Sequence, residues 1–177
     1  MDPLAWLGLR DPEESHLAAV QRSVREVLPD DEAVVIRYIV IVAILLTRVA
    51  YADGSVVRSE LDHLRALFRH VDRLPPDGIE QVCDTLYDRV PRLERADVDR
   101  CVRELRSLCN RDERRQVMRL LADLARADGQ IAAPERGALL GIGTDLNIPD
   151  EELEELLEAT AESDPAPRPD DQAPESE

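Results

Sequence analysis

Aromatic residues and glycines are scarce in this chain, which contains one Phe, one Trp, three Tyr and seven Gly in 177 residues. Hydrophobic residues nevertheless make up 44% of the sequence, which is enough to bury a core. That core must consist mainly of Leu, Val, Ile and Ala, a composition that favours helices packed on helices. No segment shows the period-two alternation of a half-buried strand. We therefore expect an all-α protein.

Lysine is absent, so all 22 basic residues are arginine, which we attribute to the base composition of the genome. The formal net charge is −16, but residues 150–177 alone contain twelve acids and one Arg, a net charge of −11. The acidity therefore belongs mainly to the last predicted helix and the tail. An anionic protein of this kind is poorly suited to bind DNA non-specifically, and we expect no nucleic-acid partner.

The familiar catalytic and metal-binding motifs are missing as well. The three cysteines, Cys83, Cys101 and Cys109, form no CxxC pair, and their apolar neighbours favour buried thiols in a reducing compartment. The chain has no Walker loop, no GxSxG sequence and no zinc-ligand spacing. These absences argue against the common nucleotide-dependent and hydrolytic enzymes, and we expect a protein that acts by binding rather than by catalysis.

Nothing in the sequence predicts insertion into a membrane. The apolar run 39–46 lies between Arg37 and Arg48 and is much shorter than the roughly 20 residues of a membrane span. We expect it to form the central buried helix. Residues 1–10 lack a basic n-region, so we expect no signal peptide and a cytoplasmic location.

Prolines and capping residues divide the chain into segments. We expect a compact bundle of about seven to nine helices, with a short apolar turn at 4–9 and helices at about 12–28, 31–52, 57–72, 77–90, 96–109, 111–127, 133–145 and 150–162. In this interpretation residues 1–30 form an N-terminal helical extension and residues 31–162 form one helical domain. The proline- and acid-rich segment 163–177 is predicted to be a disordered tail.

Two segments within the predicted domain align without a gap. YADGSVVRSELDHL at 51–64 and RADGQIAAPERGAL at 126–139 are offset by 75 residues and share Ala, Asp, Gly, a β-branched residue, Glu and Leu. Each segment follows a long apolar helix and precedes an amphipathic one. The sequence therefore predicts two pseudo-repeated helix-turn-helix units, at about 31–90 and 106–162.

Most of the shared residues have a local structural role. Gly54 and Gly129 are expected to end a helix with a positive φ, which costs other residues strain. Glu60 and Glu135 fall in the first turn of the following helix, where a carboxylate favours the positive end of the helix dipole and accepts a backbone N–H.

Two aspartates are harder to explain. Asp53 and Asp128 follow the C-terminal end of a helix, where negative charge costs roughly 0.3–1 kcal/mol. One interpretation is an Asx-type turn in which the carboxylate accepts loop N–H groups. The other is a hard-cation site shared with the glutamates, whose ligands would be Asp53, Glu60, Asp128 and Glu135.

The paired ADG…E turns, together with the segment LGIGTDLNIPDEEL at 140–153, resemble the TerB-like family. This family includes tellurite-resistance proteins of the TerB type and the N-terminal domain of DjlA-type co-chaperones. The resemblance implies a helical bundle with clustered acidic residues that bind a divalent cation, Ca²⁺, Mg²⁺ or Mn²⁺ rather than Zn²⁺. It also implies a role in stress or tellurite-resistance responses, with protein partners that include a membrane-integral resistance protein. The chain departs from the family pattern at Val57 and Ala132, where many members have a polar helix cap.

Two other features have alternative interpretations. Glu60-x-x-His63 is half of a di-iron carboxylate motif, so a carboxylate-bridged metal enzyme remains an alternative, although the second repeat has Ala138 at the position that would need the second histidine. Residues 89–126 contain eleven Arg against seven acids. This segment is either a solvated face or a surface that receives a partner or the acidic tail, as in a metal-free helical scaffold.

Overall fold

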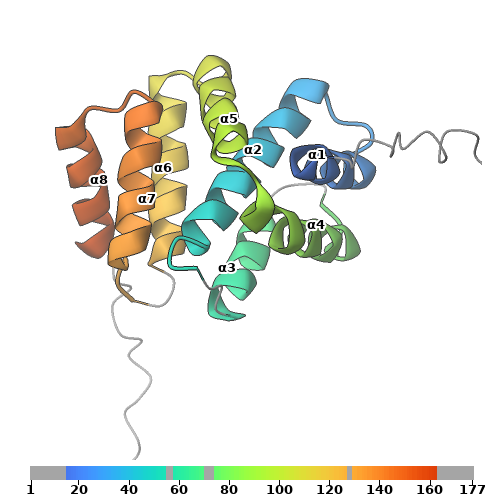
Figure 1. Ribbon diagram of the computed structural model, residues 1–177, viewed down its shortest axis with the longest axis horizontal. Coiled ribbons are helices and arrows are strands. Elements are labelled where there is room, and N and C mark those ends of the chain that lie inside the picture. Colours follow the sequence, from blue (N-terminus) through green and yellow to red (C-terminus); the bar gives the residue numbers. More distant parts are fainter. Residues whose placement is uncertain (1–14, 55–57, 70–73, 127–128, 163–177) are drawn as a thin grey trace, which may run out of the picture.

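The computed structural model describes residues 15–54, 58–69, 74–126 and 129–162 (Figure 1). Within these residues the chain forms eight α-helices and one short 3₁₀ turn, and no strand. The elements are α1 (His16–Val27), α2 (Ala33–Ala50), α3 (Arg58–Phe68), α4 (Pro76–Arg89), η2 (Val90–Arg92), α5 (Arg95–Leu108), α6 (Arg111–Ala125), α7 (Ala133–Asp145) and α8 (Asp150–Glu162). The prediction of an all-α bundle of seven to nine helices is confirmed.

The start of α1 differs from the sequence-based prediction. We expected the helix to begin at Pro12, with Asp11 as its N-cap, and both residues lie outside the described part of the chain. The structure instead begins α1 at His16, because the Ser15 hydroxyl accepts a hydrogen bond from the Ala18 N–H at 3.1 Å and so caps the helix. The helix ends at Val27, one residue before the predicted Leu28.

Helix α2 is the centre of the bundle. Its buried residues occur on all sides of the helix and include every residue from Val40 to Thr47. Within the part of the chain that the structure describes, α2 is long and apolar enough to cross a membrane by length and composition alone. A core helix passes the same test, and 61% of this window is buried by α1 and the other helices packed around it. The burial agrees with the predicted role as central helix.

The two sequence repeats correspond to α2–α4 and α6–α8, and they pack on each other reciprocally. Helix α2 contacts α6, and each of these two helices also contacts the second helix of the other repeat: α2 contacts α7, and α6 contacts α3. Within each repeat, the third helix packs on the first two. Helix α1 packs on α2 and α4, and α5 packs on α2 and α7.

Helices α2 and α6 run in the same direction and in register. Their N-terminal halves line one groove, to which α2 contributes Val34, Val35 and Tyr38 and α6 contributes Glu113 and Gln116. Tyr38 and Glu113 are 75 residues apart, which is the offset of the sequence repeat. Equivalent positions of the two repeats therefore lie at the same level along the helices. Figure 1 shows the consequence: the C-terminal ends of α2 and α6 lie at the same end of the bundle.

Candidate functional site

The first acidic turn begins where α2 ends. The Tyr51 N–H donates to the Thr47 and Val49 carbonyl groups, and the chain then turns so that the Gly54 N–H donates to the Tyr51 carbonyl at 3.0 Å. Gly54 has φ +90°, which confirms the predicted positive φ. The helix itself ends at Ala50, earlier than predicted, so Asp53 lies in the loop beyond the helix cap. Its side chain is exposed at the surface.

The second acidic turn repeats this backbone geometry at α6. Arg126, the residue equivalent to Tyr51, donates its N–H to the Ala122 and Leu124 carbonyls, and the Gly129 N–H donates to the Arg126 carbonyl at 2.9 Å. Gly129 has φ +127°. The described parts of the two turns therefore share the same backbone hydrogen bonds and a positive φ at the glycine.

The two C-cap side chains tie the turns to the third helix of their own repeats. The Tyr51 hydroxyl donates to the Tyr87 carbonyl on α4 at 3.3 Å, and the Tyr51 and Tyr87 rings lie 5.8 Å apart between centroids. The Arg126 guanidinium donates to the Leu157 carbonyl on α8. Sequence analysis missed both contacts, because Tyr and Arg share no chemistry that marks the two positions as equivalent.

Glu135 has the helix-capping role that the sequence predicted. It is the third residue of α7, its side chain is buried, and its Oε2 accepts a hydrogen bond from the Ala132 N–H at 2.7 Å. Ala132 has no side-chain acceptor, so only the glutamate half of a capping box forms. The positive end of the α7 dipole favours a carboxylate there.

Of the four predicted ligands, the structure describes the side chains of Asp53 and Glu135. Asp128 lies outside the described residues, and so does the side chain of Glu60, whose backbone is the third residue of α3. Among the described residues, no three His, Cys, Asp or Glu side chains gather in a group that could hold a metal ion. Asp53 and Glu135 are thus the described members of the candidate site, and Asp128 is two residues after the C-cap of α6 in the sequence.

Charges of both signs meet at this end of the bundle, because Arg48 lies in the last turn of α2 and Arg126 is the C-cap of α6. Each α-helix carries about half a negative charge at its C-terminal end, within its last turn. Helices α2 and α6 are parallel, so their two negative ends are at the same end of the bundle (Figure 1). Asp53 adds a full negative charge just beyond the end of α2.

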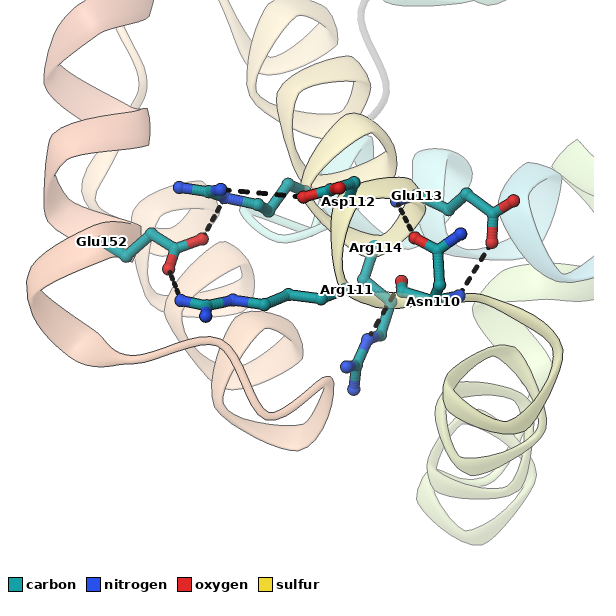
Figure 2. Close-up of polar contacts among 7 residues, drawn as sticks. Asn110, Arg111, Asp112, Glu113, Arg114 and Glu152 are labelled. Atoms are coloured by element: carbon teal, nitrogen blue, oxygen red, sulfur yellow. Dashed lines mark hydrogen bonds and ion pairs between the residues drawn. The ribbon is translucent and has the colours of Figure 1, made fainter.

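At the opposite end of α6, a second polar cluster fastens the helix to α8 (Figure 2). The Asn110 side chain accepts the Glu113 N–H at 3.0 Å, and Glu113 accepts the Asn110 N–H at 2.7 Å, which completes a capping box. Arg111 pairs with Glu152 of α8 at 2.6 Å, and Arg115 pairs with the other carboxylate oxygen of Glu152. One α8 carboxylate is therefore clamped between two α6 guanidinium groups.

This clamp changes the acidity of Glu152 and shows what part of the Arg-rich segment does. The hydrogen bond from Arg111 is the largest cause of a lowered Glu152 pKa, with the charges of Arg111 and Arg115 adding to it. Arg114 donates to the Leu146 carbonyl at 2.8 Å. These three arginines hold α6 to α8 and to the α7–α8 turn. By contrast, Arg100 and Arg103 on α5 are exposed.

All three cysteines are buried and free, as predicted. Burial raises the pKa of the Cys83 and Cys101 thiols to about 11. It also raises the pKa of Cys109, with the nearby Glu113 carboxylate adding to the effect. Since the thiolate is the reactive form, these residues are suited to packing rather than to nucleophilic catalysis or metal binding.

Comparison with known proteins identifies a family. The family model described as "Tellurite resistance protein TerB" matches residues 40–158, a range that begins within α2 and ends within α8 and contains both acidic turns. No curated protein and no solved structure matches the chain. The match covers well over half of the sequence, so this chain belongs to the TerB family.

Proposed function

We propose that this protein is a binding module of a tellurite-resistance or stress response, and that the two acidic turns together hold a hard divalent cation. The proposed ligands are Asp53 and Asp128, assisted by Glu60 and Glu135. All four are carboxylates, the ligand type that Ca²⁺, Mg²⁺ and Mn²⁺ prefer. In this proposal the protein is cytoplasmic and acts without catalysis, and the cation-bound end of the bundle is the surface that a protein partner recognises.

The observation that carries the proposal is the parallel, in-register packing of α2 and α6. It puts the two helix ends that precede Asp53 and Asp128 at one end of the bundle (Figure 1). An Asp just beyond a helix C-terminus lies near the negative end of the helix dipole, and two negative charges brought to one end of the bundle repel each other. A bound cation would offset both costs. Family membership supports a resistance role, and a membrane-integral resistance protein is the partner that we propose on that basis.

Thermal melting with and without metals tests the proposal. Melting is recorded in chelator and in millimolar Ca²⁺, Mg²⁺, Mn²⁺ or Zn²⁺, at constant ionic strength. A cation that binds only the folded state stabilises it by about 2.7 kcal/mol at a hundredfold excess over Kd. We expect the gain with one of the first three cations. Asp53→Asn and Asp128→Asn keep the side-chain shape and remove the charge, so each should abolish the gain.

Two further variants sharpen this experiment. Asp84→Asn removes one exposed charge from α4, outside the acidic turns, and should keep the full response, which excludes a general effect of charge. Glu135→Gln keeps a side-chain oxygen that can accept the Ala132 N–H and so separates capping from metal binding. Loss of the response in Glu135→Gln would assign it as a ligand. A wild type indifferent to every cation would overturn the metal proposal.

Luminescence of Tb³⁺, a substitute for Ca²⁺, gives a reading specific to the first turn. Tyr51 is two residues before Asp53 and absorbs the ultraviolet light that sensitises a nearby Tb³⁺ ion. We expect sensitised emission from the wild type, displaced by Ca²⁺ and absent in Asp53→Asn. The alternative of a carboxylate-bridged metal enzyme would gain support only from a redox-active Mn or Fe centre that turns over a substrate.

A further inference from the structure

The described surface contains one cluster of exposed large hydrophobic side chains. Val34, Val35 and Tyr38 lie on one face at the start of α2 and are 40%, 40% and 38% exposed. The other exposed large hydrophobic residue among those described is Tyr87, on α4. A single exposed hydrophobic side chain is ordinary, whereas a cluster marks a surface that something covers.

The three side chains form one wall of a groove of about 380 Å³. The other wall consists of Leu108 and Cys109 at the end of α5, with Glu113 and Gln116 of α6. Partial desolvation of the Tyr38 side chain, together with the nearby Cys109 and Glu113, raises the Tyr38 pKa. The groove is therefore apolar, with a polar rim on one side.

A second hollow, which shares no lining residue with the groove, reaches the point where the described chain begins. It lies between α1, α2 and α5 and is lined by Ser15, Arg37 and Glu104, among others. Arg37 and Glu104 pair at 3.5 Å across the α2–α5 interface. Arg37 is three residues after Val34 on α2, a rise of about 4.5 Å. The hollow that contains Ser15 and the apolar groove thus both border the α2–α5 interface.

The chain before Ser15 has the composition that this groove requires. The segment Leu4–Leu9, LAWLGL, has four large apolar side chains, including the only tryptophan. The other terminal segment, 163–177, has no Leu, Ile, Val, Met or aromatic residue. Five residues separate Leu9 from Ser15, and at about 3.3–3.6 Å each they reach roughly 17 Å, more than one helical turn.

We infer that the segment Leu4–Leu9 binds within its own chain to the groove formed by Val34, Val35, Tyr38 and Leu108. The segment supplies large apolar side chains, and the groove supplies an exposed apolar surface that can bury them. Burying each large side chain stabilises the bound form by about 1.5–3 kcal/mol before the entropy of ordering is subtracted. The inference concerns the end of the bundle opposite the acidic turns and does not depend on the proposed cation.

Trp6 reports on this contact directly, because it is the only tryptophan in the full-length chain. We expect its fluorescence emission to lie at shorter wavelength than in the urea-unfolded chain and to be several-fold less sensitive to acrylamide. Val34→Gln combined with Val35→Gln should shift the emission to longer wavelength and restore the quenching. The circular dichroism spectrum should not change, because both side chains are already 40% exposed. Tyr87→Gln, the matched control on α4, should leave Trp6 protected.

A second variant tests the same contact from the other side without altering the bundle. Leu7→Gln combined with Leu9→Gln should expose Trp6 to the same extent as the groove variant. Emission in the wild type equal to that of the unfolded chain would overturn the inference, as would protection that survives both double variants. Protection that disappears on dilution would overturn it too, because it would place the segment on a second copy of the chain.

Discussion

At the scale of single residues, the glycines separate two effects of the same substitution. Gly54, Gly129 and Gly141 all have open space where an alanine Cβ would project, so steric contact is not a factor at any of them. Gly54 and Gly129 have positive φ, whereas Gly141 is inside α7. We predict that Gly54→Ala and Gly129→Ala each destabilise the fold by about 1–2 kcal/mol. Gly141→Ala should stabilise it by about 0.5–1 kcal/mol.

Urea denaturation of the three variants measures these differences, with Gly141→Ala as the control for the chemical change itself. Equal effects in all three would mean that the backbone conformation of the turns is not what requires glycine. The variants should also be compared in chelator, so that any bound cation does not contribute to the measured stability.

The residue-scale predictions from sequence succeeded where the cause is local. The positive φ of Gly54 and Gly129 and the Glu135 cap follow from the chemistry of a few neighbouring residues. The Tyr51 and Arg126 tethers could not be predicted in the same way, because each joins residues more than 30 positions apart. The Ser15 cap was missed for another reason: Asp11-Pro12 is a stronger local signal four residues earlier.

At the scale of elements, the Glu152 clamp between α6 and α8 predicts a pH-dependent stability. The pKa of Glu152 is lowered from the ordinary 4.5 by Arg111 and Arg115. A carboxylate with a lowered folded-state pKa contributes stability above its unfolded pKa, and the contribution is lost as pH falls through the folded value. We therefore predict that Glu152→Gln lowers the Tm at pH 7. The difference from the wild type should shrink progressively below about pH 4.5.

Glu155→Gln is the matched control, since Glu155 is exposed on the same helix, three residues away. This variant should lower the Tm only slightly at neutral pH, and the decrease of its Tm at acidic pH should match that of the wild type. A Glu152→Gln variant whose Tm differs from the wild type by a constant amount at every pH would contradict the ion-pair explanation and indicate a packing defect.

Most element boundaries could be predicted because the chain marks them. Prolines and capping residues lie near the helix ends, and the predicted helices at 133–145 and 150–162 match α7 and α8. The short turn η2 (Val90–Arg92) was missed, since Pro91 was interpreted only as the end of the preceding helix. Helix α3 begins at Arg58, close to the predicted residue 57, although residues 70–72 of that prediction lie outside the described residues.

At the scale of the whole molecule, most of the net charge lies in α8 and the terminal segment that follows it. The segment 163–177 has five acids and one Arg, and it lies outside the described residues. A proline-rich acidic chain buries too little apolar surface to become ordered by itself. We predict that deleting residues 163–177 leaves the Tm nearly unchanged at physiological ionic strength, as measured by calorimetry.

The same deletion measured at low salt is the control for long-range charge effects, which are screened as ionic strength rises. A loss of stability that persists at high salt would contradict the prediction and show that the tail docks. The exposed arginines of α5, Arg100 and Arg103, would then be the first residues to change to Gln.

The arrangement of the two repeats in space could not be predicted from the sequence alone. The 75-residue offset identifies α2 and α6 as equivalent, but an offset does not specify whether equivalent helices touch, or in which direction they run. Tertiary packing decides this through apolar surfaces such as those of α2, which is buried on nearly all sides. The candidate site follows from that packing, so its residues could be proposed from sequence but their common location could not.

The reciprocal contacts of α2 with α7 and of α6 with α3 suggest how such a protein originates. Two similar units that pack in parallel through reciprocal contacts have the geometry of an isologous homodimer. In such a dimer the same surface patch of each subunit contacts its copy on the other. Duplication and fusion of the gene for one such unit would yield this chain and free each half to diverge. Tyr51 and Arg126 are consistent with that divergence: the equivalent position of each repeat holds a different side chain, and each side chain binds its turn to the third helix of its own repeat.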